Sequence, residues 1–131
     1  MAGTREMVLY YAPERSEKTR ILKSVLVRMG IRIKNIMPDQ AGQQVGYLAG
    51  LEGFEEQPQG EAPPAIPEEM LVLHGFDNRR LDELLIQLRR AKASVALKAV
   101  LTESNCTWSF YQLYKEIRAE HEMMAAGKTR H

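Results

Sequence analysis

Hydrophobic residues follow a pattern that occurs twice along the chain. Each half opens with a short, almost continuous apolar run, over residues 7–11 and 70–73, which is typical of a strand covered on both faces. Apolar residues then recur every three or four positions, which predicts an amphipathic helix. A second run, over 31–37 and 95–101, has the alternating pattern of an edge strand. Another helical segment completes each half.

Residues that favour helix ends refine these boundaries. Pro13 suits the first turn of a helix, where its missing N–H group would be unpaired in any case. Gly30 suits the left-handed position after a helix, and Asp77 suits an N-cap. We predict the last helix over 107–123, followed by a frayed tail after Ala125.

The order of burial is the same in both halves and predicts the fold. We expect an α/β domain with a four-stranded, mainly parallel sheet built from two β-α-β-α repeats, with helices on both faces. The buried first and third strands should be central, which gives the order 2-1-3-4. Antiparallel halves remain open as an alternative, because the connection between the halves is long.

The predicted domain spans residues 1–131, with halves at 6–51 and 70–125. The linker over 52–69 contains six glutamates and no basic residue, and its prolines are Pro58, Pro63, Pro64 and Pro67. Such a segment is expected to form no regular structure and to be mobile in part.

Composition excludes several classes of protein. The formal net charge of +1 argues against a dedicated nucleic-acid binder. A single cysteine cannot form an internal disulfide. No apolar run approaches the roughly 20 residues of a membrane-spanning helix, and the first residues lack a signal-peptide pattern. We therefore expect a cytoplasmic protein that has no membrane association. We infer no metal site and no cofactor.

Polar residues follow the predicted central strands. In a parallel sheet of this order, ligands bind beyond the carboxyl ends of the strands, where the winding reverses. Tyr11, His74, Asp77 and Asn78 would line that crevice. His74 could carry a proton or donate a hydrogen bond, oriented by Asp77. The alternative is structural: His74 ends a strand and Asp77 caps a helix.

Three glycines, Gly42, Gly46 and Gly50, recur every fourth residue in a predicted helix over 40–51. A line of glycines would allow close approach of another backbone or a flat ligand. It could equally indicate a poorly formed helix, since each glycine costs roughly 1 kcal/mol relative to alanine.

The last predicted helix carries further candidates. Cys106 would lie at its N-terminus, a position that lowers the pKa of a thiol. Without a partner cysteine or base, a small buried residue is the favoured interpretation. Trp108 and Tyr111 belong to an aromatic-rich segment that could form a dimer or partner surface, although core packing explains it as well.

The second half also resembles a known family. Met70-Leu71-Val72-Leu73-His74-Gly75-Phe76, Leu84-Leu85 and Lys98-Ala99-Val100-Leu101-Thr102 are similar to a small bacterial domain family of unknown function. The resemblance covers roughly residues 69–122, and Val45-Gly46-Tyr47-Leu48-Ala49-Gly50-Leu51 looks like the segment that often precedes that domain. It implies no activity, cofactor or catalytic residue. It marks a distinctive cluster around the fourth strand and last helix: Lys98, Thr102, Asn105 and Trp108.

These observations favour a cytoplasmic α/β module that binds a partner protein or a small ligand, as a homodimer. The alternative is a small enzyme with a crevice site around His74, Asp77 and Asn105, with Thr102 as a further polar group. A nucleic-acid accessory role through the basic helix of the second half is the third hypothesis and the least favoured.

Overall fold

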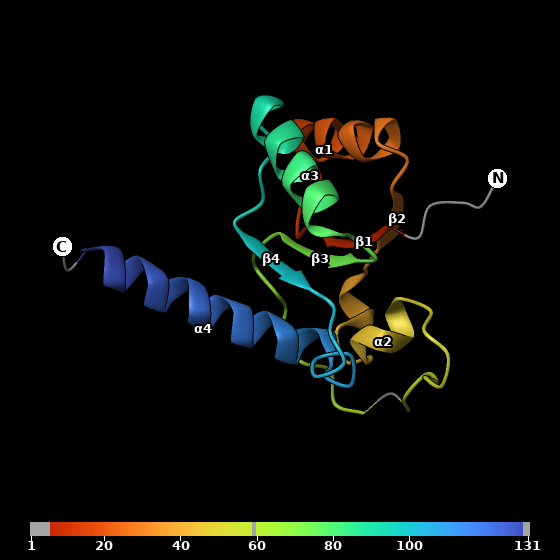
Figure 1. The fold of residues 1–131 in the computed structure, drawn as a ribbon. Helices are drawn as coiled ribbons and strands as arrows, with labels where there is room; N and C mark the ends of the chain where they lie inside the picture. Colours follow the sequence, from red (N-terminus) through yellow and green to blue (C-terminus); the bar gives the residue numbers. More distant parts are fainter. Residues whose placement is uncertain (1–5, 59, 130–131) are drawn as a thin grey trace.

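The computed structural model describes residues 6–58 and 60–129, with side chains as far as Met123. Strands and helices follow one another in the predicted order (Figure 1). Their bounds are β1 Met7–Tyr11, α1 Glu17–Arg28, β2 Arg32–Asn35, the 3₁₀ helix η1 Pro38–Gln40, α2 Val45–Leu48, β3 Met70–His74, α3 Asn78–Arg90, β4 Leu97–Val100 and α4 Phe110–Thr129.

The sheet has the predicted order β2-β1-β3-β4. Two parallel pairs, β1 with β2 and β3 with β4, flank a central antiparallel pair of β1 and β3. The mainly parallel sheet is therefore confirmed, and its one antiparallel pair joins the halves in the way that the alternative described. The physical reason is the long connection after α2, which returns to the end of β1 so that Met70 pairs with Tyr11.

Helices cover both faces of the sheet, as predicted. In Figure 1, α1 and α3 lie on one face, whereas α2 and the first half of α4 lie on the other. Alternation along the strands divides the core accordingly. Val8, Tyr10, Leu71 and Leu73 belong to the cluster under α1 and α3. The intervening strand residues, such as Leu9 and Val72, belong to the cluster under α2 and α4.

The first helix begins later than its proline indicated. Pro13 lies in the loop before α1, and the N-cap is Ser16. Thr19 N donates to Ser16 Oγ at 3.4 Å and Ser16 N donates to Thr19 Oγ1 at 3.2 Å, which is a reciprocal capping box. The expectations for Gly30, with φ 75°, and for the Asp77 cap of α3 are confirmed.

The last helix is displaced along the chain. It begins at Phe110 rather than 107, because residues 102–109 form turns in which Asn105 Oδ1 accepts from Thr102 N at 2.8 Å. The tail predicted after Ala125 is also wrong as far as Thr129, since α4 continues to that residue. In Figure 1 the second half of α4 extends away from the sheet.

The linker 52–69 contains no helix or strand among its described residues, yet it packs against the core at several points. The Ile66 side chain is buried, and its carbonyl oxygen accepts from Tyr11 OH at 2.7 Å. Further back, Gln57 N donates to Gln43 Oε1 at 2.7 Å. Within the described ranges, none of the helices has both the length and the apolar character needed to cross a membrane.

Candidate functional site

The antiparallel central pair separates the residues that were predicted to line one crevice. Met7 pairs with His74 and Tyr11 pairs with Met70, so Tyr11 and His74 lie at opposite ends of the two strands. At about 3.4 Å per residue this is a separation of roughly 13 Å. The predicted crevice between them is therefore wrong, because it required the carboxyl ends of β1 and β3 to meet at one edge.

The other polar candidates follow β3 and β4, whose parallel pairing places their carboxyl ends at one edge of the sheet. Asp77 Oδ1 accepts from the backbone N–H of Arg80 at 2.8 Å and so caps α3. Asn78 is the exposed first residue of that helix, and His74 is half-buried. A ligand-binding role for these side chains stays a prediction.

Asn105 is buried and engaged in the turn after β4. Its Oδ1 accepts from Thr102 N, its Nδ2 donates to the carbonyl oxygen of Val100 at 3.0 Å, and its own N–H donates to Thr102 Oγ1 at 3.1 Å. These bonds end the strand and shape the loop, so Asn105 and Thr102 act first as structural residues.

The three glycines do not lie along one helix, because only Val45–Leu48 of the helix predicted over 40–51 is α-helical. The backbone here pairs instead with the loop before α4: Val45 N donates to the Trp108 carbonyl and Gly46 N to the Cys106 carbonyl, both at 2.8 Å. Gly46 lies under the ring of Phe54, where a Cβ would approach ring atoms to 2.8 Å. Gly42 is exposed, and Gly50 follows α2 with φ 76°.

The remaining candidates lie in or beside that loop. Cys106 precedes α4 by four residues rather than beginning it, and its Sγ donates to the Glu103 carbonyl at 3.3 Å. Trp108 and Tyr111 are half-buried and pack against the core under α4. Their role as an interface stays a prediction. Among the described residues no group of three or more His, Cys, Asp or Glu side chains could hold a metal ion.

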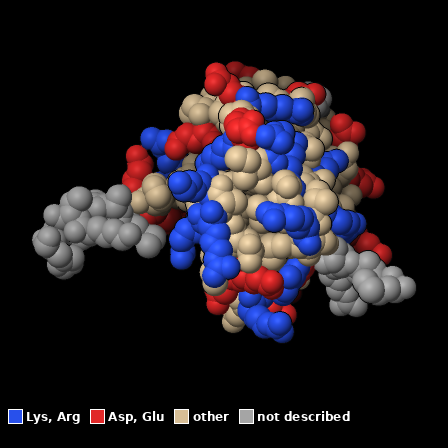
Figure 2. Space-filling model, turned by 90° about the horizontal axis from the view of Figure 1, so that it is seen from above, with Lys and Arg blue, Asp and Glu red and all other residues tan. Residues whose placement is uncertain are grey.

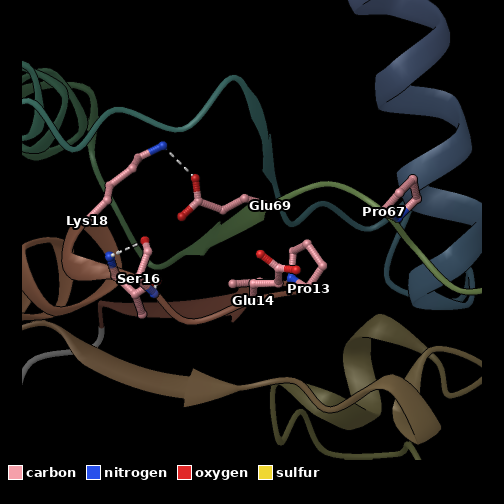
Figure 3. Close-up of a pocket in the computed structure, with 8 residues that line it drawn as sticks. Pro13, Glu14, Ser16, Lys18, Pro67 and Glu69 are labelled. Carbon is pink, nitrogen blue, oxygen red and sulfur yellow. Dashed lines mark hydrogen bonds and ion pairs between the residues drawn. The ribbon is translucent and has the colours of Figure 1, made fainter.

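A cleft of about 590 Å³ lies between the β1–α1 loop and the segment before β3 (Figure 3). In Figure 3, Lys18 points from α1 toward Glu69, whereas Pro13 and Pro67 lie farther from α1. The full lining is Ala12, Pro13, Glu14, Ser16, Lys18, Thr19, Pro67 and Glu69.

Hydrogen bonds within this cleft converge on Glu69. Its Oε1 accepts from Lys18 Nζ at 2.7 Å, and its Oε2 accepts a short hydrogen bond from Tyr10 OH. Burial, together with the hydrogen bond to Glu69, raises the pKa of Tyr10 from 10.0 to about 12. Tyr10 stays protonated near neutral pH and donates to Glu69.

The volume of the cleft suits a small molecule, but its central polar groups satisfy one another. Lys18, Tyr10 and Glu69 join the start of α1 to the residue before β3. This arrangement fastens the two halves of the chain together. The cleft is better explained as a structural contact than as a binding site.

A second concavity differs because its apolar surface is uncovered. The groove between α3 and β4, here called the α3–β4 groove, has a volume of about 160 Å³ and is lined by Leu73, Leu81, Leu85, Lys98, Ala99 and Val100. In register, Lys98 pairs with Leu71 and Val100 with Leu73. Both therefore project from the face that carries α1 and α3, yet Val100 remains 48% exposed.

Cationic side chains border this groove. An adjoining hollow of about 100 Å³ shares Leu85 and Lys98 with it and adds Arg89. In the described part of the chain, Lys98 and Arg89 form no ion pair. Burial and the nearby charge of Lys18 lower the pKa of Lys98. Figure 2, the view onto α1 and α3, shows Lys and Arg gathered across this face.

The sequence pattern of α3 contains a signal for the groove. Four leucines form the stripe of α3, but only Leu84 and Leu88 are fully buried, whereas Leu81 and Leu85 are partly exposed. The sequence could not show that α3 leaves β4 uncovered, because the apolar stripe of a helix contains no information about the width of the sheet beneath it.

Comparison with known proteins is informative for the second half. No curated protein and no solved structure matches the chain. Residues 69–124 match the model of a family described as a domain of unknown function (DUF3783), which confirms the resemblance predicted for this segment. Every residue that lines the α3–β4 groove lies in the matched range, whereas Glu69 is the only lining residue of the cleft that does.

Proposed function

We propose that this chain is a protein-binding module and that the α3–β4 groove holds an apolar side chain of the partner. The observation that carries the proposal is the exposure of Val100 beside an apolar hollow on a face whose other strands are covered by helices. The match over residues 69–124 supports it, because that segment contains the entire groove.

The size of the groove selects the kind of ligand. Pockets for small molecules usually occupy about 300–1,000 Å³, whereas this groove has about 160 Å³. That space fits one or two side chains rather than a cofactor. Burial of one aliphatic side chain contributes roughly 1.5–3 kcal/mol, so a partner needs further contacts along β4 or α3 for stable association.

Selection from a displayed library of random peptides tests this function on the full chain. The test variant is Val100→Glu, and the matched control is Val27→Glu, since Val27 is 68% exposed on α1 and lines neither the groove nor the cleft. Selected peptides should bind the wild type and the control equally and bind Val100→Glu about tenfold more weakly, a difference of about 1.4 kcal/mol.

Circular dichroism checks that both variants fold. Two results contradict the proposal: a selection that enriches no binding peptide, and peptides that bind the Val100→Glu variant as tightly as the wild type.

A further inference from the structure

The outer edge of β4 presents backbone groups as well as the groove. Leu101 N donates to the Leu73 carbonyl at 2.9 Å. In a parallel pair, alternate residues direct both backbone groups to the same neighbour. Ala99 and Leu97 therefore face β3, whereas Lys98 and Val100 face outward. The Asn105 amide already caps the Val100 carbonyl. Within the described structure, three backbone groups at this edge have no neighbouring strand: the N–H groups of Lys98 and Val100 and the carbonyl of Lys98.

We infer that an extended segment of the partner adds to β4 as a fifth strand and carries an acidic residue two positions from an apolar residue. This inference rests on the proposed function and names its partner class. Strand addition to an exposed sheet edge is a common mode of peptide recognition.

The spacing follows from the side chains of β4. Lys98 and Val100 are two residues apart and project from one face, and an added strand places its own alternate residues opposite them. The residue opposite Val100 is apolar because it extends into the groove. The residue opposite Lys98 is acidic, because Lys98 and Arg89 lack carboxylate partners in the described chain. The spacing is the same for either direction of the added strand.

The charges and the chain itself argue against two other occupants. Pairing of β4 with β4 of a second copy would bring two cationic borders together, and like charges across adjacent strands are unfavourable. The linker 52–69 of a second copy is acidic, but its prolines cannot donate ladder hydrogen bonds. Its large apolar residues are already engaged in its own chain, because Ile66 is buried and the Phe54 ring lies against Gly46.

Two synthetic nonapeptides test the inference on the full chain. One has the sequence Ser-Thr-Val-Thr-Glu-Thr-Val-Thr-Ser, which places a valine two positions from the glutamate for either direction of the added strand, and the other replaces its glutamate with lysine. Binding is followed by NMR titration at low salt, together with hydrogen exchange of the Lys98 and Val100 amides. The glutamate peptide should bind the wild type about fivefold more tightly and slow exchange at both amides.

The charge-reversed variant Lys98→Glu should prefer the lysine peptide by a similar factor. Because Lys98 is an exposed residue of the edge strand β4, this variant is expected to fold, and circular dichroism verifies it. An inverted preference cannot be caused by unfolding. Val27→Glu again serves as the control and should retain the wild-type preference.

The outcomes separate this inference from the proposed function. Equal binding of both peptides by the wild type, or no binding at millimolar concentration, overturns the acidic strand. The inference is also overturned if hydrogen exchange of the Lys98 and Val100 amides is unchanged in the bound state. It is overturned too if self-association of the free protein already slows exchange at these amides. In each case the proposed function stands if library-selected peptides still depend on Val100, and it fails if they do not.

Discussion

Replacement of Arg80 by alanine should lower the free energy of unfolding by about 3 kcal/mol. Arg80 lies in the first turn of α3 and connects three segments of the chain. Its Nε and Nη2 donate to the two carboxylate oxygens of Glu6 at 2.7 and 2.6 Å, and Nη2 also donates to the Met29 carbonyl at 2.8 Å. The start of β1, the end of α1 and the start of α3 are thereby held together.

The magnitude follows from burial of this pair. The side chain of Glu6 is 10% exposed and that of Arg80 is 28% exposed. Removal of one partner from a buried pair costs about 3–5 kcal/mol, and the partial exposure of Arg80 places the effect at the lower end. The bond from Arg80 Nη1 to Glu83, at 3.1 Å, lies at the surface and contributes less than about 0.5 kcal/mol.

Urea unfolding followed by far-ultraviolet circular dichroism measures these differences. Arg80→Lys should fall between the wild type and Arg80→Ala, because lysine keeps the charge but loses the bidentate geometry. Glu83→Gln is the control and should stay near the wild type. The reasoning is refuted if Arg80→Ala changes stability by less than about 0.5 kcal/mol, the range of ordinary surface substitutions. It is also refuted if Glu83→Gln costs as much as Arg80→Ala.

Two further predictions concern Tyr10 and the contact of Gly46 with Phe54. The pKa of Tyr10 is raised in the folded state from 10.0 to about 12. The contribution of Tyr10 to the free energy of unfolding is thus fully present below pH 10 and is lost as pH rises toward 12. Denaturant titrations across this range should show that decline, and the decline should be smaller in the Tyr10→Phe variant. Gly46→Ala should destabilise the chain by about 1 kcal/mol, because overlap with the Phe54 ring exceeds the gain in helix propensity. In a Phe54→Ala background the same change should be neutral or stabilising, and a double-mutant cycle without coupling would exclude the contact.

The strand order could be predicted because burial differs between strands. The continuous apolar runs of β1 and β3 mark central strands, and the alternating pattern of β2 marks an edge. Strand direction could not be predicted in this way. Alternation with a period of two residues is identical for parallel and antiparallel neighbours, and a linker as long as 52–69 can return the chain to either end of β1.

The candidate sites depended on strand direction and shared its error. His74 and Tyr11 were placed together only because β1 and β3 were expected to be parallel. The Asp77 cap was predictable, since an N-cap is a local interaction between neighbouring residues. The short α2 was not, because Val45 and Gly46 donate to carbonyl groups sixty or more residues later in the chain.

The sequence by itself determined the elements of the second half, the central positions of β1 and β3 and the absence of an internal disulfide, because these depend on local pattern and composition. Only the tertiary structure decided which polar residues meet and which apolar residues stay uncovered. Val100 is exposed because α3 does not extend over β4, and Glu69 accepts hydrogen bonds from Lys18 and Tyr10 because the linker brings it beside them. Such contacts between distant segments have no counterpart in the periodicity of either segment alone.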